Sequence, residues 1–273
     1  MPVIGRAGTQ YVPILDRSRR RLRLPLDLLP EALRHASDEG LASPLAAVRM
    51  ETGGLMADGH LDPVATDLLR VMTAASLMVA VEVQQGGDES LATIWATPNR
   101  AVVTSSLDPT LVDVEPVRIG RLPDKLSELI VLEPPRAVAD RPVRLLTALL
   151  ADADTHRRDP AAFQRRLVDG GVLERDALRL WAFGAPATRR WRISSTWTTA
   201  DGHQTAELRG LDAGSEGQWL IEMTGRRDHG GEMVFYPQGD GELLRALRHV
   251  LPRRWVGTAL KLSPADAVPS VAG

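Results

Sequence analysis

The chain has 273 residues, of which 44% are hydrophobic, so it can bury a large core in one domain or in two small ones. Its formal net charge of −2 argues against the phosphate-driven affinity of a nucleic-acid-binding protein, and the absence of cysteine excludes disulfides, thiolate catalysis and cysteine-based zinc sites. No apolar run approaches the roughly 20 residues that span a bilayer, and the N-terminus has no leader pattern, so neither membrane insertion nor export is predicted.

Residues 1–20 are predicted to form an extended strand and loop, which include the start of the basic run Arg17–Arg23. Such a run could contact nucleic acid or anionic lipid. No aromatic side chain is interspersed to stack on bases, so a solvated strand edge or loop explains the run better. The sequence therefore predicts no nucleic-acid partner. The next segment, Leu26–Ala36, has the periodicity of an amphipathic helix.

Two stretches of the sequence share a turn followed by an amphipathic helix, which indicates an internal repeat. Leu55–Met72 contains the turn Asp58-Gly59, and Leu167–Phe183 contains the turn Asp169-Gly170. A shift of 111 residues superimposes the two turns and the apolar face of the two helices. We therefore expect two diverged copies of one structural unit.

Each of these helices is followed by three β-patterned runs that are separated by turn residues. The runs are Leu77–Val83, Leu91–Ala96 and Ala101–Ser105 in the first copy, and Trp191–Thr198, Thr205–Leu211 and Trp219–Thr224 in the second. Tight turns at Gly86-Gly87 and Asp201-Gly202 favour antiparallel meanders. Three tryptophans lie on the runs of the second copy and are expected to be mostly core.

A further short strand and a closing amphipathic helix end each copy. They are Val112–Ile119 with Asp124–Leu132, and Met233–Tyr236 with Gly241–Leu251. A shift of 118 residues puts Leu126 on Leu244 and Leu129 on Leu247. The opening helices Leu26–Ala36 and Val143–Ala153 form the weakest pair of the set.

The predicted fold class is α+β, with two pseudo-symmetric copies of a helix, antiparallel meander and helix unit. The N-terminal copy is expected at residues 1–133 and the C-terminal copy at 137–256, packed together as a single globular unit, with a disordered tail at 262–273. Pro134-Pro135 separates the copies. The two meanders either continue as one sheet or pack against each other, because both arrangements cover apolar faces and open edges.

No motif supports catalysis or a cofactor. The sequence has neither a phosphate-binding loop with Lys and Ser or Thr nor a Gly-x-Ser-x-Gly elbow. His60 with Asp62 and His229 with Glu232 are conceivable metal pairs, but no third ligand accompanies either of them. The sequence predicts no metal, no cofactor and no enzyme activity.

Three passages resemble the EspG family, namely Ala47–Met72, Leu77–Val83 and Gly217–Met223. The resemblance covers roughly residues 24–252 and consists of diffuse helix and strand patterns. It implies a pseudo-two-fold fold in which two helical bundles flank a central antiparallel sheet. It also implies a cytoplasmic chaperone of a type VII (ESX) secretion system, which binds PE/PPE-type heterodimers without a cofactor and keeps them soluble and export-competent.

The resemblance also implies a partner-binding surface, made from the loop between the first two meander strands and from helices of the C-terminal copy. The loop maps to Gln85, Gly86, Gly87, Asp88, Glu89 and Ser90, and it is shorter than the extended versions of the family. Its acidic residues could meet a basic partner, or the segment is a bare hairpin turn. On the C-terminal side the candidates lie in Ala161–Leu167 and Leu173–Trp181 and include Arg165, Leu173 and Arg175.

Two other classes of function stay open at this point. A self-associating structural or adaptor protein of a type VII system, without PE/PPE substrates, is one alternative, because exposed strand edges invite pairing and a homodimer. An enzyme with a pocket between the copies is the other, and it would need convergent polar side chains that the sequence does not reveal.

Overall fold

The computed structural model describes residues 11–39, 43–130, 141–224, 231–239 and 241–253. Its helices have these bounds: α1 Leu29–Ala36, α2 Pro44–Thr52, α3 Pro63–Thr73, α4 Leu122–Ile130, α5 Thr147–Asp154, α6 Pro160–Asp169, α7 Glu174–Phe183 and α8 Glu242–His249. Short 3-10 turns precede α1 and α4 and follow β11. The predicted boundary around Pro134-Pro135 and the predicted tail 262–273 lie outside the described residues.

The strands form one large sheet and one small hairpin. In the first copy they are β1 Ile14–Asp16, β2 Arg21–Pro25, β3 Met56–Ala57, β4 His60–Leu61, β5 Leu77–Gln85, β6 Asp88–Thr97, β7 Arg100–Asp108 and β8 Leu111–Val117. In the second copy they are β9 Val143–Leu146, β10 Arg189–Thr199, β11 Gly202–Asp212, β12 Gln218–Thr224 and β13 Glu232–Gln238. Strands β3 and β4 pair only with each other in the described part of the chain.

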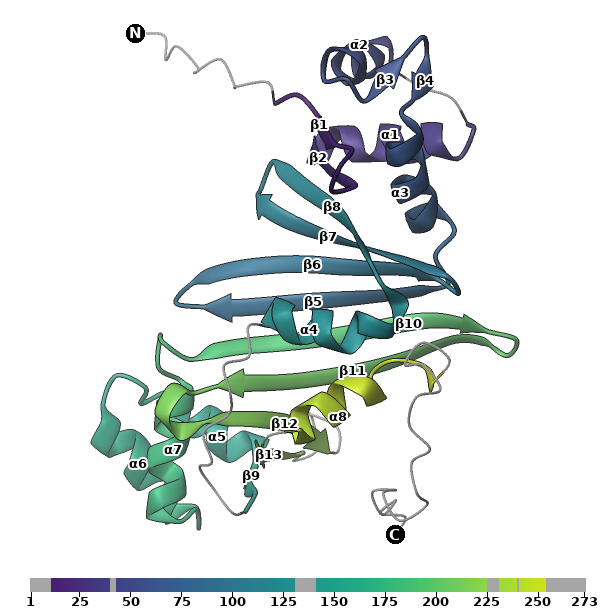
Figure 1. Cartoon of the computed structure of the whole chain (residues 1–273). Coiled ribbons are helices and arrows are strands. Elements are labelled where there is room, and N and C mark those ends of the chain that lie inside the picture. The colour runs from purple at the N-terminus through teal and green to yellow at the C-terminus, as the bar shows by residue number, and fades with distance from the viewer. Residues whose placement is uncertain (1–10, 40–42, 131–140, 225–230, 240, 254–273) are drawn as a thin grey trace, which may run out of the picture.

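The large sheet is antiparallel, and its order is β1-β2-β8-β7-β6-β5-β10-β11-β12-β13-β9. Without β1, this order reads as the same unit from either end, because β2, β8, β7, β6 and β5 have β9, β13, β12, β11 and β10 as counterparts. Figure 1 shows α1–α3 at one end of the sheet, α5–α7 at the other, and α4 and α8 across its middle. The α+β fold with two pseudo-symmetric copies is confirmed, and the meanders continue as one sheet.

The two copies meet where β5 pairs with β10. Val81 lies opposite Ile193, with Val79 opposite Ser195 on one side and Val83 opposite Trp191 on the other. A shift of 112 residues exchanges these two flanking pairs and maps Val81 onto Ile193. The contact is therefore self-complementary in the manner of a two-fold dimer interface, although it lies within one chain.

Three cores are arranged on the two faces of the sheet. Alternate residues of β5 and β10, including Val81 and Ile193, pack under α4 and α8 in the central core. On the opposite face, α1–α3 cover the β2 and β8 end, and α5–α7 cover the β9 and β13 end. Trp219 is 1% exposed and lies in the second end core. Trp191 is buried in the central core and Trp197 is partly buried against it, so the prediction that the three tryptophans are mostly core is confirmed.

Three helices begin with the same local signal, a polar residue followed by proline. Ser43, Asp62 and Asp159 precede the prolines that start α2, α3 and α6, and each side chain accepts a hydrogen bond from a backbone amide of the first turn. Proline fits there because its missing N–H would have no partner in the helix. Local sequence chemistry therefore sets the helix starts.

The predicted match between the turns Asp58-Gly59 and Asp169-Gly170 is wrong. Asp58-Gly59 is the two-residue turn of the β3–β4 hairpin, with φ of 52° and 76°. Gly170-Gly171 instead ends α6 as Gly53-Gly54 ends α2, because Val172 donates to the carbonyl of Leu167 as Leu55 does to that of Met50. The β3–β4 hairpin is an insertion between α2 and α3 of the first copy. The helix match between α3 and α7 at a shift of 111 still holds.

The predicted match between the closing helices is displaced by three residues. Leu122, Leu126 and Ile130 of the first copy and Leu243, Leu247 and Leu251 of the second are the buried positions. They superimpose at a shift of 121, as do β8 and β13, and not at 118. Helical periodicity alone accepts both shifts, because residues three apart share a face.

The opening helices α1 and α5 superimpose at a shift of 118, which supports their pairing. Residues Val143–Leu146, predicted as the start of a helix, are instead strand β9. They pair with β13, and Val143 and Leu145 point into the end core. The tertiary pairing with β13 outweighs the helical periodicity of this short apolar run.

The closing helices provide a test of the corrected alignment. Leu247→Ala should lower the free energy of unfolding by about 3 kcal/mol, because its side chain is fully buried. Leu244→Ala should lower it by less than about 1 kcal/mol, because Leu244 is 37% exposed. Urea denaturation measures both changes, and equal losses would contradict the alignment.

Candidate partner-binding surface

The predicted loop between the first two meander strands is a tight hairpin turn. Gly86 and Gly87 form the turn with φ of 62° and 97°, a backbone region that suits glycine. Gln85 lies opposite Asp88 and ends β5, whereas Asp88, Glu89 and Ser90 belong to β6. All six predicted residues are exposed. The loop is therefore two residues long, shorter than the six-residue segment that the sequence suggested.

This turn of the first copy lies against the second copy. The Gln85 side chain donates to the carbonyl oxygen of Ala187 at 3.4 Å and accepts from Arg189 Nη2 at 2.8 Å. The adjacent Arg190 donates to the carbonyl oxygen of Phe183 at 3.0 Å, at the end of α7. The β5–β6 turn and the α7–β10 connection consequently form one continuous surface.

Helices α6 and α7 form the other part of the surface, and aromatic packing holds them together. Phe163 of α6 meets Trp181 of α7 edge-on, with ring centroids 5.4 Å apart. The Arg157 guanidinium lies 4.6 Å from the Phe163 ring centroid and donates to the carbonyl oxygen of Leu180. Burial lowers the pKa of Arg157, and the nearby charge of Asp154 opposes that effect.

A buried carboxylate fixes the start of α7. Asp176 is 6% exposed and accepts from Arg141 and from Arg179, each at 3.1 Å. Arg179 also lies 3.4 Å from Glu216, which connects α7 to the end of β11. Because Asp176 lies in the first turn of the helix, its negative charge also interacts favourably with the helix dipole.

The three predicted residues of the C-terminal copy are all exposed on this helix pair. Leu173 precedes α7 and is 51% exposed, Arg175 lies in the first turn of α7, and Arg165 lies on α6. Leu173 and Arg175 lie at the start of α7, whereas the β5–β6 turn lies beside the connection at its end, and ten residues at 1.5 Å each make α7 about 15 Å long. The predicted residues therefore mark the two ends of one surface and not a single cluster.

Sequence reasoning missed Val168 of this surface and did not single out Leu178, although Leu178 lies within the candidate range Leu173–Trp181. Val168 of α6 is 41% exposed and Leu178 of α7 is 49% exposed. Their signal was available, because apolar residues outside the buried positions of an amphipathic helix face solvent. With Leu173 they give the helix pair an apolar character that a partner could cover.

Sequence reasoning also missed a ladder of charges across the middle of the sheet. Arg192 of β10 lies 3.7 Å from Glu82 of β5 and 3.1 Å from Glu207 of β11, and Glu207 also accepts from Arg209. The ladder faces away from α4 and α8, on the side that carries both helical bundles. Partial burial raises the pKa of Glu207, but the hydrogen bond and charge of Arg209 and the charge of Arg192 outweigh it, so the pKa lies below its ordinary value.

Among the described residues, no group of three or more His, Cys, Asp or Glu side chains is arranged to hold a metal ion. Within the same ranges, no helix is both long and apolar enough to cross a membrane. Asp62, one member of the conceivable metal pair with His60, caps α3 and accepts a hydrogen bond from Arg17.

The fold matches a solved structure of the Mycobacterium tuberculosis type VII secretion system chaperone EspG5 in complex with a PE25-PPE41 dimer. The match has a TM-score of 0.62 at 13% sequence identity and covers 85% of this chain and 97% of that chain. The chain has an EspG-like fold. The resemblance that the sequence suggested is thus confirmed at the level of the fold. No family model matches the sequence, and no curated protein matches it.

Removal of the buried carboxylate should loosen the α6–α7 pair. We expect Asp176→Asn to lower the free energy of unfolding by about 2 kcal/mol, because the nearly buried carboxylate loses its charge-assisted hydrogen bonds with Arg141 and Arg179, which are themselves partly exposed. Thermal and urea denaturation measure the loss. The control is Asp169→Asn, an exposed carboxylate at the end of α6, which should change stability little. A comparable loss in both variants would contradict the role of Asp176.

The charge ladder should make stability depend on pH. Because the folded pKa of Glu207 is lowered, its contribution is present above the unfolded pKa of about 4.3 and is lost as the pH falls through the folded pKa. Glu207→Gln should remove this part of the pH dependence between about pH 5 and pH 3. Denaturation across this range tests it, with the exposed Glu89→Gln as the control. If the free energy of unfolding of wild type and Glu207→Gln had the same dependence on pH, the proposed contribution of Glu207 to stability would be contradicted.

Proposed function

We propose that the protein is a non-catalytic chaperone that binds substrates of a type VII secretion system, and specifically a PE/PPE-type heterodimer. The observation that carries the proposal is the EspG-like fold over 85% of the chain, since the matched structure is a chaperone in complex with a PE25-PPE41 dimer. The absence of a catalytic motif in the sequence agrees with a binding function. Binding would occur in the cytoplasm, where a substrate must be kept soluble before export.

The surface proposed for this partner is the α6–α7 pair together with the β5–β6 turn. Val168, Leu173 and Leu178 offer exposed apolar area, which a partner segment with an apolar tip would cover. Arg165 of α6 and Arg175 of α7 are exposed on the same two helices and add positive charge to them. Apolar anchors surrounded by charged residues are the usual composition of a specific protein interface.

Because the β5–β6 turn is short, helices α6 and α7 offer more contact area to a partner than the turn does. Two turn residues beyond β5 and β6 extend only a few ångströms from the sheet, because a strand residue spans about 3.3 Å. Asp88 and Glu89 can therefore contact only a partner that already lies against the end of α7. We propose that α6 and α7 supply most of the affinity and that the turn contributes to selectivity.

A second candidate function, self-association as an adaptor, rests on the sheet edges. Among the described strands, β1 and β9 are the two ends of the large sheet and each pairs on one side only. Exposed edges can pair with a second copy. Light scattering after size exclusion distinguishes the two functions, because an adaptor forms a stable homodimer whereas a chaperone stays monomeric until its substrate is added.

Co-expression with a PE/PPE-type pair tests the chaperone proposal. Wild-type protein should co-purify with the pair and raise its soluble fraction, and Leu173→Glu with Leu178→Glu should reduce recovery of the complex at least about tenfold by burying charge in an apolar contact. The control is Leu244→Glu, a similarly exposed leucine on α8. Unchanged recovery of the complex with the double variant would show that the interface does not include Leu173 and Leu178. Failure of the wild-type protein to co-purify with the pair would refute the chaperone function.

A further inference from the structure

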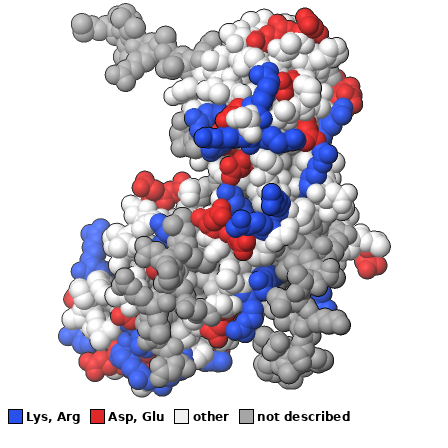
Figure 2. Space-filling model, in the orientation of Figure 1, with Lys and Arg blue, Asp and Glu red and all other residues white. Residues whose placement is uncertain are grey.

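The basic run Arg17–Arg23 is not explained by the proposed chaperone surface, and the structure places it at the far end of the molecule. It occupies the β1–β2 hairpin of the N-terminal half, in which β2 has β9 as its counterpart and β1 has no counterpart among the described strands. Figure 2 shows a band of Lys and Arg side chains across this half. The β1–β2 hairpin thus belongs to the half of the molecule that carries this band of basic side chains.

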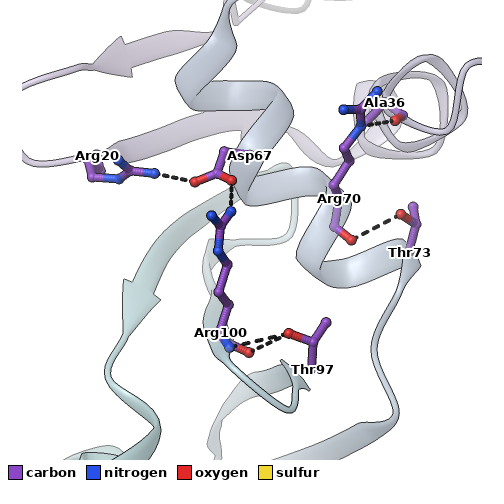
Figure 3. Close-up of polar contacts among 7 residues, drawn as sticks. All are labelled: Arg20, Ala36, Asp67, Arg70, Thr73, Thr97 and Arg100. Carbon is purple, nitrogen blue, oxygen red and sulfur yellow. Dashed lines mark hydrogen bonds and ion pairs between the residues drawn. The ribbon is translucent and has the colours of Figure 1, made fainter.

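On one side of the hairpin, two arginines share a single carboxylate. Asp67 of α3 accepts from Arg20 of the β1–β2 turn through one oxygen and from Arg100 of β7 through the other, as Figure 3 shows. Two guanidinium groups carry ten N–H donors and two positive charges, which one carboxylate cannot satisfy. The cluster therefore retains surplus positive charge, and the side chains of Arg20 and Arg100 are 50% and 61% exposed.

On the other side of β2 the same arrangement recurs. Arg21 and Arg23 both donate to Asp113 of β8, at 2.5 and 2.7 Å. Burial raises the pKa of Asp113, but the hydrogen bonds and charges of Arg23 and Arg21 outweigh it, so this carboxylate stays charged and holds both arginines in place. Leu22 and Leu24, which alternate with these arginines, are buried under α1–α3. The arginines therefore lie on both faces of the sheet edge.

The turn between the strands adds the most exposed charges. The Arg17 side chain is 64% exposed beside Asp62, and the Arg19 side chain is 80% exposed at 3.9 Å from Asp16. Strand β1 ends the sheet within the described residues, so no described strand blocks an approach along this edge. We define the arginine surface as Arg17, Arg19, Arg20, Arg21, Arg23 and Arg100.

We propose that the arginine surface binds an extended, Asp- and Glu-rich segment of a partner protein that passes along the β1 edge. Each of these arginines already forms an ion pair with a carboxylate of this chain while its side chain stays at least 41% exposed, and guanidinium groups bind carboxylates in a directional, often bidentate way. The arrangement around an edge favours a chain over a lipid surface, because a flat bilayer cannot touch both faces of β2 together. The hairpin has no aromatic residue on which nucleic-acid bases would stack.

This inference goes beyond the proposed chaperone function and does not depend on it. Fluorescence anisotropy with a labelled peptide of alternating acidic and β-branched residues tests it on the full chain. Wild type should bind, and the affinity should fall several-fold between about 50 mM and about 200 mM salt. Arg17→Gln with Arg19→Gln should weaken binding about tenfold, because two charge-assisted contacts are lost at exposed positions.

The control variant is Arg245→Gln with Arg248→Gln, which removes the same charge from exposed positions of α8. It should bind as wild type does, as should Leu173→Glu with Leu178→Glu. Three results would overturn the proposal: equal loss in the control, equal binding of a peptide in which Gln replaces each acidic residue, or tighter arginine-dependent binding of anionic vesicles or of an oligonucleotide than of the acidic peptide. The proposal would also be overturned if Arg17→Gln with Arg19→Gln formed oligomers and still bound the peptide. The arginines would then only protect the β1 edge from pairing with a second copy.

Discussion

The pairing of β5 with β10 is the contact on which the arrangement of the molecule depends. Val81 and Ile193 face each other at its centre, and both point toward α4 and α8. The pseudo-two-fold rotation that relates the two copies maps Val81 onto Ile193, and both side chains lie on the same face of the sheet. The rotation axis is therefore perpendicular to the sheet. The closing helices must therefore share one face and the two bundles the other. With the bundles at the two ends of one face, the middle of that face has no covering helix, and the exposed ladder of Arg192 lies there.

The symmetry holds in the cores and is broken at the surface. Buried positions of α4 and α8 superimpose, and Ala65, Leu69 and Met72 of α3 superimpose on the buried Asp176, Leu180 and Phe183 of α7, because close packing tolerates few changes of volume. Among the described residues, strand β1 and the β3–β4 hairpin are found in the first copy, where they add residues outside the repeated unit, and not in the second. Insertions of this kind cost little when they lie at the surface. Both proposed binding surfaces include features that differ between the copies.

Shared carboxylates are a recurring device in this chain. Asp176 holds Arg141 and Arg179 in the second copy, and Asp113 holds Arg21 and Arg23 in the first. Neither residue is the counterpart of the other, so the device arose on different elements. In each case an almost buried acid orients arginines that remain partly exposed. Such an arrangement contributes more to the orientation of the exposed groups than to net stability.

The sequence by itself determined the local elements, since the alternation of Leu77–Val83, the glycines after it and the proline-started helices act through neighbouring residues. It also carried the resemblance that the fold confirms. Only the tertiary structure decided the shift of 121 between the closing helices, the strand state of Val143–Leu146 and the position of Gln85 beside Ala187. Each of these depends on which segments pair across more than 80 residues, and periodicity within one segment contains no information about its distant partner.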